Sequence, residues 1–379
     1  MKLLHVSPTW FGEGSFIGGA ERYVRELARA TAEVADVTWI SFADRADSIR
    51  DGRLQIEILR RSRLPGVSRL ATNPLSPRLS RLVRQADVVH CHQPYTFSTD
   101  AALVAARFFR KKAFVTDLGG GHRWAASKLV PLLRGADALL LISEYSRRLW
   151  RETPASRRPA RLEVIWGGVD TAAFCPAPSP SPRSDETLFV GRLLPHKGVN
   201  YLIEAMPADA PLRVVGRPFD PRFLYRLQAL AEQRQVTFET TADDETLVER
   251  YRRALVTVLP SVYEPIEGPS TRQPELLGLA VLESMACGTP VIVTGVASLP
   301  ELVEEGVTGY IVPPNDPAAI RERLARLRAD RALADAMGRR AREAVLRRFT
   351  WPLVARRCLE AYECRTGVTA HPQVGIGPS

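Results

Sequence analysis

The regular alternation of short β-branched runs with longer amphipathic stretches constrains the fold of this chain more than any other feature. The candidate strands of the first half are residues 3–7, 37–42, 54–59, 87–92, 113–117, 138–143 and 162–166. Those of the second half are residues 187–191, 212–216, 236–239, 255–259, 290–293 and 310–312. Stretches with helical periodicity, among them 20–31, 123–134 and most of 318–363, separate or follow them. Strands that alternate with helices form a parallel sheet covered on both faces, so we predict an α/β fold.

A Pro- and Ser-rich segment divides this pattern into two sets. Residues 175–186 (CPAPSPSPRSDE) lack apolar periodicity, which is typical of a linker. The length of the chain also suits two domains of about 150–200 residues each. We therefore predict two Rossmann-like domains, residues 1–174 and 187–350, which face each other across a cleft. In open α/β sheets ligands bind beyond the carboxyl ends of the strands, so the loops after strands are the places to look for chemistry.

Composition excludes several classes of protein. A hydrophobic content of 45% and a charged content of 25% are those of a globular protein. No apolar run approaches the ~18 residues of a membrane span, and the first ten residues resemble a strand rather than a signal peptide. The five cysteines form no CxxC pair, so we expect free thiols in a reducing cytoplasm and no disulfide framework. We also expect no zinc site, because no clustered ligands are visible in the sequence.

The positive charge is concentrated in the first half of the chain. Residues 1–175 carry 27 Lys and Arg against 17 Asp and Glu, whereas residues 176–379 carry 25 of each. Much of the excess lies in residues 60–84, where Arg alternates with Leu and Pro. Such a stretch suits an anionic membrane surface, in which case the protein would make peripheral contact at the inner membrane face. It also suits an acidic acceptor. A solvated loop and helix face explains the stretch as well. Nucleic acid is disfavoured because no stacking aromatics interleave with the basic residues.

A glycine pair follows the first strand. Gly18 and Gly19 open a helix in the sequence GGAERYV, where they let the backbone approach a ligand while the helix N-terminus offers N–H groups to an anion. Ile17 stands where the dinucleotide fingerprint requires a third glycine. A plain strand–helix turn explains the pair equally well.

Two cations follow the first strand of the second half. Arg192 and Lys197 lie in the turn GRLLPHKG (191–198), from which both can point into the cleft. Their chemical use there would be to bind a diphosphate and to stabilise the charge that builds on it as a glycosidic bond breaks.

Two glutamates flank the start of a predicted helix, residues 279–286, in PELLGLAVLESMACGTPVIVT (274–294). Glu275 would accept hydrogen bonds from the hydroxyls of a donor sugar, and Glu283, separated from it by seven residues, from the ribose of its nucleotide. The backbone of the intervening stretch would present N–H groups to the phosphates at the positive end of the helix dipole. The donor-binding residues predicted in this stretch are Glu275, Leu277, Gly278, Leu279 and Glu283.

Two histidines end the strand DVVHCH. Alternation sends His90 and His92 to the same face, one or both at the cleft, with His92 nearer the tip. Metal dependence is not expected, because no Asp-x-Asp pair occurs to hold Mg²⁺ or Mn²⁺ on a diphosphate. The two cations and the helix N-terminus would supply that electrostatic work.

Together these segments resemble the retaining glycosyltransferases of family 4, which have the GT-B fold. The matching stretches are GGAERYV, VVHCHQP, LISEYS, WGGVDTAAF, GRLLPHKG, LPSVYE and ELLGLAVLESMACGTPVI, in the family's order and over nearly the whole chain. The resemblance implies that Arg192 and Lys197 grip the donor diphosphate, that Glu275 faces the transferred sugar, and that Glu283 faces the ribose. It further implies that Gly19 lets the N-terminal loop close over the phosphates and that His92 lies near the reacting carbon.

The resemblance also assigns roles to the two halves. Residues 1–174 would bind the acceptor, residues 187–350 the nucleotide sugar, and a helix at 351–365 would cross back to the N-terminal domain before a flexible tail, 366–379. Backbone near Gly216 and Thr240 would read the base. The loop from Thr116 to His122 would close over the acceptor, which we expect to contact His92, Asp117 and His122.

The chain departs from the family pattern at two places. It has Trp166-Gly-Gly-Val-Asp170 where members often have PNGVD. Residues 263–275 are longer than the usual Glu-Gly-Phe-Gly approach, so Glu264 and Glu267 stay open as alternatives to Glu275.

The predicted function is metal-independent, retaining transfer of a sugar from a UDP- or GDP-sugar to a hydroxyl of a glycoside, natural product or lipid-linked glycan. Attack would come from the same face, assisted by the departing phosphate, because no well-placed nucleophile stands out. The alternatives are a non-catalytic binder of sugar nucleotides or polyanions and another GT-B enzyme such as an epimerase.

Overall fold

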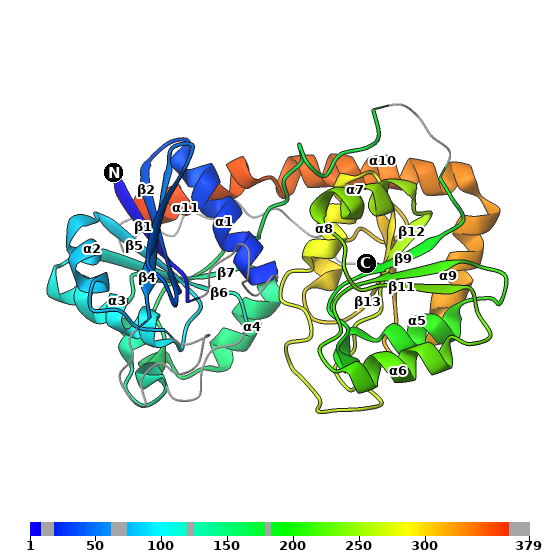
Figure 1. Ribbon diagram of the computed structural model, residues 1–379, viewed down its shortest axis with the longest axis horizontal. Coiled ribbons are helices and arrows are strands. Elements are labelled where there is room, and N and C mark those ends of the chain that lie inside the picture. The colour runs from blue at the N-terminus through cyan, green and yellow to red at the C-terminus, as the bar shows by residue number, and fades with distance from the viewer. Residues whose placement is uncertain (9–18, 62–73, 120–124, 179–182, 364–379) are drawn as a thin grey trace.

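The computed structural model describes residues 1–8, 19–61, 74–119, 125–178 and 183–363, and it consists of two α/β halves side by side (Figure 1). Each half contains one sheet with helices on both faces. The predicted α/β class with two Rossmann-like halves is therefore confirmed.

The N-terminal sheet has the strand order β3-β4-β2-β1-β5-β6-β7-β8. Every pairing is parallel except that of β3 with β4. The bounds are β1 Lys2–Val6, β2 Asp36–Ala43, β3 Asp47–Asp51, β4 Leu54–Arg60, β5 Val88–His92, β6 Lys112–Asp117, β7 Ala138–Leu141 and β8 Leu162–Val164. Alternate residues of β1 enter opposite cores: Leu3 packs with α1 and α11, and Leu4 with α2 and α3. A strand buried on both faces is what its uninterrupted apolar sequence predicts.

The C-terminal sheet is entirely parallel, with the order β11-β10-β9-β12-β13-β14. Its bounds are β9 Thr187–Val190, β10 Leu212–Val215, β11 Val236–Glu239, β12 Val256–Leu259, β13 Val291–Thr294 and β14 Gly309–Val312. Helices α5, α6 and α9 pack on one face, and α7 and α8 on the other. The core beneath α7 and α8 is continuous with the core beneath α1 and α11, so one apolar cluster spans both halves.

Most helices begin at a residue that caps them. The α-helices are α1 Gly19–Ala32, α2 Leu79–Gln85, α3 Phe97–Phe108, α4 Glu144–Glu152, α5 Val199–Ala205, α6 Pro221–Leu230, α7 Asp244–Arg253, α8 Leu279–Ala286, α9 Pro317–Ala329, α10 Arg331–Arg348 and α11 Trp351–Glu363. The side chains of Ser143, Asp243 and Asp316 accept a hydrogen bond from the first turn of α4, α7 and α9. Asp330 does the same for α10 and so ends α9, a break that was not predicted.

The last helix returns to the N-terminal half, as predicted. Helix α10 runs along the C-terminal half and leads into α11, which lies against the N-terminal sheet (Figure 1). There Lys112 Nζ donates to the carbonyl of Tyr362 at 2.7 Å, and Arg161 Nη1 donates to that of Ala361 at 2.9 Å. The apolar face of α11 packs in the same cluster as α1.

One predicted helix is wrong. Residues 123–134 were expected to form a helix, but the described part contains only the 3₁₀ turns η1 (Ala126–Lys128) and η2 (Leu132–Gly135). Pro131 interrupts the amide ladder between them and explains the break. Strand β3 was missed because its sequence, DSIRD, is polar and its residues lie at an exposed sheet edge.

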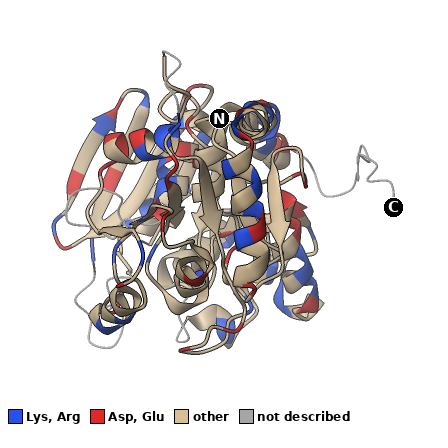
Figure 2. Ribbon diagram, turned by 90° about the vertical axis from the view of Figure 1, so that its right-hand side faces the viewer, with Lys and Arg blue, Asp and Glu red and all other residues tan. Residues whose placement is uncertain are grey.

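In the C-terminal half most charged residues lie on the helices (Figure 2). Figure 2 looks onto the C-terminal half, where basic and acidic segments are interspersed on the helices and the strands are mainly uncharged. Within the described ranges, every helix is too short or too polar to traverse a lipid bilayer. Part of the basic stretch at 60–84, the middle of the linker, and the tail 366–379 lie outside the described residues.

Candidate active site between the two halves

The turn after β9 brings Lys197 to Glu275. A short 3₁₀ turn, Pro195–Lys197, ends at Gly198 with a φ of 68°, and a Cβ at Gly198 would collide with the carbonyl of Pro260. This tight approach fixes the turn against the loop that follows β12. Lys197 Nζ donates to the carbonyl of Pro274 at 3.2 Å and forms an ion pair with Glu275.

Glu275 is further held by its own neighbours. The hydroxyl of Ser261 lies 3.5 Å from Oε1 of Glu275, and Ser298 Oγ donates to its carbonyl at 3.2 Å. The side chains of Lys197 and Glu275 are 13% and 12% exposed, so a polar ligand can reach both. Arg192 lies exposed on the same turn. Burial, followed by the charge of Lys197 and a smaller effect of Arg192, lowers the pKa of His196 to about 4.

Glu283 lies inside the first turns of α8 and is almost fully buried, 5% exposed. The Tyr251 hydroxyl donates to its Oε2 at 3.0 Å, and Arg22 Nη1 lies 3.7 Å from its Oε1. Burial raises the pKa of the Glu283 carboxyl, and the Arg22 charge and the Tyr251 hydrogen bond partly oppose that rise. Arg22 also forms an ion pair with Asp244 at the start of α7, so one arginine from α1 bridges to two carboxylates of the other half.

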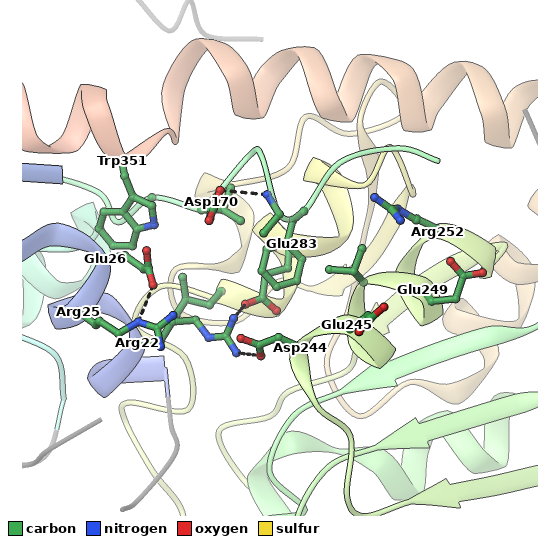
Figure 3. A pocket seen from close by; sticks show the side chains of 16 residues that line it. Arg22, Arg25, Glu26, Asp170, Asp244, Glu245, Glu249, Arg252, Glu283 and Trp351 are labelled. Atoms are coloured by element: carbon green, nitrogen blue, oxygen red, sulfur yellow. Dashed lines mark hydrogen bonds and ion pairs between the residues drawn. The ribbon is translucent and has the colours of Figure 1, made fainter. Parts of the chain in front are cut away.

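A cavity of about 460 Å³ lies between the halves beside Glu283 (Figure 3). Helix α1 supplies Arg22, Arg25 and Glu26, and α7 supplies a row of acidic and basic side chains on the opposite wall. Leu279 and Glu283 line this cavity, whereas Arg192, Lys197 and Glu275 do not. The predicted donor residues therefore face the boundary between the halves as two separate groups, joined by the loop that leads from Glu275 to α8.

The loop between Glu275 and α8 lies between the Lys197–Glu275 group and the Glu283 group. Its leucines pack on glycines of the N-terminal half. We call residues 276–279 (LLGL) the leucine loop. A Cβ at Gly19 would lie 3.1 Å from Leu279, and one at Gly119 would lie 2.6 Å from Leu276. A Cβ at Gly167 would collide with Leu277. Larger residues at these glycines would hold the two halves apart.

The remaining predicted donor residues lie at the ends of several elements, and one of them lies outside the described residues. A Cβ at Gly216 would collide with the carbonyl of Gly191, so the loops after β9 and β10 touch. Thr240 is half-buried directly after β11. Gly278 has a φ of 85° at the start of α8. Gly18 lies outside the described residues.

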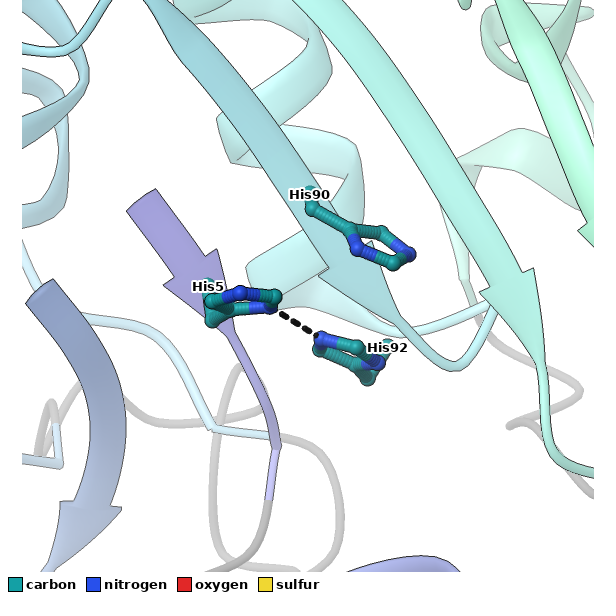
Figure 4. A group of neighbouring side chains, drawn as sticks. All are labelled: His5, His90 and His92. Atoms are coloured by element: carbon teal, nitrogen blue, oxygen red, sulfur yellow. Dashed lines mark hydrogen bonds between the residues drawn. The ribbon is translucent and has the colours of Figure 1, made fainter. Parts of the chain in front are cut away.

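The two histidines of β5 do share a face, but neither is exposed at the cleft. Ring centroids of His90 and His92 lie 4.2 Å apart, and both side chains are fully buried (Figure 4). His5 of β1 completes the group: its Nδ1 lies 2.8 Å from Nε2 of His92. One nitrogen from each of the three rings lies within 4.8 Å of one nitrogen of the other two, a spacing that could hold a metal ion. This cluster is not visible in the sequence, because the parallel pairing of β1 with β5 is what sets His5 beside His90.

Asp117 has an internal role in the structure. Its Oδ2 accepts from the indole of Trp150 at 2.6 Å and its Oδ1 from the amide of Gly119 at 2.9 Å. The side chain is buried, and burial raises the pKa of its carboxyl. These contacts anchor α4 and the loop after β6 rather than leave the carboxylate open to an acceptor. His122 of the same loop lies outside the described residues.

The long approach to Glu275 reaches across to the N-terminal half. We call residues 264–274 the insertion. Arg272 Nη2 lies 2.7 Å from Glu152 Oε2, and the Tyr145 hydroxyl donates to the carbonyl of Arg272 at 2.7 Å. The two alternative glutamates are exposed, and Glu267 pairs with Arg226 at 2.6 Å. Of the three candidates, only Glu275 contacts Lys197 among the described ion pairs.

The departure at WGGVD is explained by the crossover. Val169 bridges to Thr350, and its amide donates to the carbonyl of Phe349 at 2.8 Å. A Cβ at Gly168 would lie 2.9 Å from the ring of Trp351. This segment therefore seats the beginning of α11.

Sequence reasoning missed the residues that bridge the halves. Arg22 directly follows the glutamate of GGAE, and Tyr251 lies on a helix that carried no motif. Glu301 of the C-terminal half accepts from the amides of Glu144 and Tyr145, at 2.8 and 2.6 Å, and so caps α4 of the other half. Only the clustering of charge near predicted helix ends could have indicated these contacts.

Two family descriptions match this chain. Residues 177–344 match the family described as Glycosyl transferases group 1, and residues 17–173 match Glycosyltransferase Family 4. The chain is 31% identical to the alpha-maltose-1-phosphate synthase of Mycolicibacterium smegmatis over 65% of its own length and 67% of the relative's. It is 28% identical to a D-inositol 3-phosphate glycosyltransferase of Jonesia denitrificans over 99% and 97% of the two chains.

Solved structures share the architecture. The Anabaena protein Alr3699/HepE, solved in complex with UDP, superposes with a TM-score of 0.72 at 19% identity and covers 95% of this chain and 99% of its own. Sucrose-phosphate synthase from Thermosynechococcus elongatus gives 0.69 at 23% identity over 95% and 98%. These likenesses establish the GT-B fold. With both family matches and the relatives above, they show that the chain is a glycosyltransferase of family 4 with the GT-B fold.

Proposed function

We propose that this enzyme transfers a sugar, with retention and without a metal ion, from a nucleotide-diphosphate sugar to a hydroxyl of a small molecule. The observation that carries the proposal is the Lys197–Glu275 ion pair, partly exposed at the boundary between the halves. A cation and an acid in contact there suit a ligand with a diphosphate next to sugar hydroxyls.

Donor binding would exchange internal contacts for ligand contacts. The diphosphate would take the place of Glu275 beside Lys197 and would draw in exposed Arg192, which frees Glu275 to accept from hydroxyls of the sugar. The ribose would compete with Arg22 for Glu283, which keeps its hydrogen bond from Tyr251. Each exchange replaces one charge-assisted contact with another, so the site need not leave a buried charge unpaired.

The reaction would follow from this arrangement. The acceptor oxygen forms a bond to C1 of the sugar on the face from which the phosphate leaves, while the bond from C1 to the β-phosphate oxygen breaks. The acceptor proton passes to the departing phosphate oxygen, and the nucleoside diphosphate leaves. Lys197, Arg192 and the N-terminus of α8 would stabilise the charge that grows on that phosphate.

The relatives favour particular substrates. UDP is bound by the Anabaena protein, and UDP-2-fluoro glucose by a trehalose-6-phosphate protein of the same fold. D-inositol 3-phosphate is named for several curated relatives. We therefore propose a UDP-sugar as donor before a GDP-sugar. As acceptor we propose a small, hydroxyl-bearing phosphate ester before a lipid-linked glycan. The basic charge of residues 1–175 suits an anionic acceptor.

The test begins with binding and ends with products. A nucleotide at 100 times its dissociation constant should stabilise the protein by about 2.7 kcal/mol, which a thermal unfolding screen of UDP, GDP and ADP detects. The sugar donor is then chosen to carry the nucleotide that stabilises the protein, and it is offered with a panel of polyols and polyol phosphates. Mass spectrometry should find a glycosylated acceptor. Binding without turnover would support a non-catalytic binder instead. Conversion of the nucleotide sugar with no acceptor product would support an epimerase.

A further inference from the structure

The carboxyl end of β5 has two buried polar atoms without a partner among the described residues. They are Nδ1 of His92 and Nε2 of Gln93. Gln93 also has a φ of 91°, which residues other than glycine rarely adopt. Buried polar atoms are nearly always hydrogen-bonded, and backbone strain concentrates at ligand sites. This end of β5 therefore offers one acceptor and one donor to a molecule other than the described chain.

Hydrogen bonding determines which nitrogen of His92 is the acceptor. Thr31 Oγ1 lies 2.8 Å from the carbonyl of Leu27 and donates its single hydrogen there. The Thr31 oxygen also lies 3.2 Å from Nε2 of His5, and it must accept the hydrogen bond there. Nε2 of His5 therefore carries a hydrogen. A neutral imidazole has one N–H, which leaves His5 Nδ1 as an acceptor. His92 Nε2, 2.8 Å away, must then donate, and His92 Nδ1 has no hydrogen.

Both rings must be neutral for this order to hold. His5 and His92 are fully buried, and the charges of the described chain do not compensate them. Burial lowers the pKa of His5 to about 3 and lowers that of His92 well below its ordinary value. Neither ring is charged near neutral pH.

The third ring, His90, does not take part in the chain of hydrogen bonds from Thr31 through His5 to His92. Its Nδ1 lies 2.6 Å from the Tyr362 hydroxyl and its Nε2 lies 2.6 Å from Thr116 Oγ1. Both nitrogens are occupied within the core. A metal ion among the three rings would have to replace the hydrogen bond between His5 and His92, so the geometry favours the hydrogen-bonded arrangement.

We infer that Thr31 and His5 are positioning residues that hold His92 as its Nε2–H tautomer, so that Nδ1 accepts a hydrogen bond from a sugar hydroxyl. This inference rests on the proposed function, because the molecule that would reach Nδ1 of His92 is the sugar that the proposed reaction transfers. The relay begins in α1 and passes through β1 to β5, and Thr31 contacts neither Lys197 nor Glu275. The amide of Gln93 next to it would donate to the same hydroxyl or to its neighbour.

The tautomer can be measured without any assay of activity. NMR of the full chain labelled with ¹⁵N-histidine correlates ring nitrogens with carbon-bound protons, and the loss of signals in His92→Gln identifies His92. We expect a neutral His92 ring with its hydrogen on Nε2. Thr31→Val removes the hydroxyl at nearly constant volume and should give mixed tautomers in His5 and His92, whereas Thr31→Ser should retain the native pattern. Hydrogen on Nδ1 in the native protein, a native pattern in Thr31→Val, or zinc bound to the purified protein through these rings would overturn the inference.

Kinetics separate the inference from the proposed function. Thr31→Val should lower kcat by about tenfold with an unchanged KM for the donor, and Thr31→Ser should restore kcat. Equal kcat in Thr31→Val and the native enzyme would contradict the positioning role of Thr31 and His5, but it would not contradict the proposed transferase activity. If the native enzyme transfers no sugar to any acceptor, the proposed function fails, and the NMR result still decides the tautomer.

Discussion

At the scale of single residues, Lys197 and Glu275 are placed so that each satisfies the charge of the other. Glu275 is 12% exposed and lies on the loop before α8, where its side chain supports little apolar packing. Its replacement should therefore affect chemistry more than folding.

Glu275→Gln should lower kcat/KM by about 10²–10³, because the amide cannot balance Lys197 or accept from sugar hydroxyls as a carboxylate does. The matched control is Glu267→Gln, which changes an exposed glutamate of the insertion paired with Arg226. Initial rates of product formation measure both variants, and their melting temperatures show whether the fold is intact. Equal rates for the two variants would remove Glu275 from the site.

The buried histidines predict an acid-sensitive fold. His5, His90 and His92 have pKa values lowered by burial, to about 3 for His5, whereas an unfolded histidine titrates near 6.5. The unfolded chain therefore binds more protons as the pH falls below 6.5, and stability is lost from there towards the folded pKa values. Each histidine contributes about 1.4 kcal/mol per pH unit within this window.

Two buried carboxyls act in the opposite sense. Burial raises the pKa of Glu283 and of Asp117, so their contribution to stability is present at low pH and lost as the pH rises. Three histidines outnumber them, and we expect the free energy of unfolding to fall from pH 6.5 to 5. Urea unfolding at several pH values measures the slope, and His90→Gln should reduce it by about one histidine's share. A stability that is flat over this interval would contradict the buried, neutral cluster.

At the scale of elements, the leucine loop and the glycines opposite it form a close apolar contact between the halves. Each of its three leucines faces a different N-terminal glycine. The contact involves apolar side chains and backbone rather than polar pairs. Only residues without a Cβ allow the loop to approach so closely.

Gly167→Ala should hinder this approach, because the new Cβ collides with Leu277 and comes within 3.1 Å of the Tyr23 ring. Overpacking of this kind costs about 1–3 kcal/mol, which corresponds to a fall in kcat of about 5- to 160-fold if closure precedes chemistry. Gly135→Ala is the matched control, since nothing lies within 4 Å of its Cβ. Steady-state kinetics and small-angle scattering in the presence of UDP would test the pair. Native kcat in Gly167→Ala would show that this contact is not required for turnover.

Most elements could be predicted from the sequence because their cause is local. Strand β11 was predicted with the bounds that it has because its sequence, VTFE, alternates apolar and polar residues. Helix α8 was likewise predicted with its observed bounds, because its sequence, LAVLESMA, is mainly apolar. Strand β3 could not be predicted, because its stability comes from pairing with β4 rather than from its polar sequence. The same limit applies to the site: Lys197 and Glu275 follow predicted strands or precede a predicted helix, whereas Arg22 reaches Glu283 only through the packing of two domains.

At the scale of the whole molecule, the two halves are tied at several points far apart in sequence. Helix α11 packs on the N-terminal sheet, Glu301 caps α4, and Arg22 bridges to Asp244 and Glu283. Of these contacts, that of Arg22 reaches the site, so the charge around Glu283 is set by both halves together. In the proposed function, the described cations at this boundary and the N-terminus of α8 would supply the positive potential that a diphosphate needs.

The positive groups at the boundary between the halves lead to a prediction about metal ions. Lys197, Arg192 and the positive end of α8 are fixed in the protein, and no Asp-x-Asp pair occurs in the sequence to coordinate a cation on the donor. Activity should therefore be unchanged in excess EDTA and should not rise when Mg²⁺ or Mn²⁺ is added. Lys197→Met should lose activity, and Mn²⁺ should not restore it, since no group of three or more carboxylates among the described residues has the spacing of metal ligands. Loss of native activity in EDTA with recovery on addition of Mn²⁺ would mean that a metal, rather than the two cations, neutralises the departing phosphate.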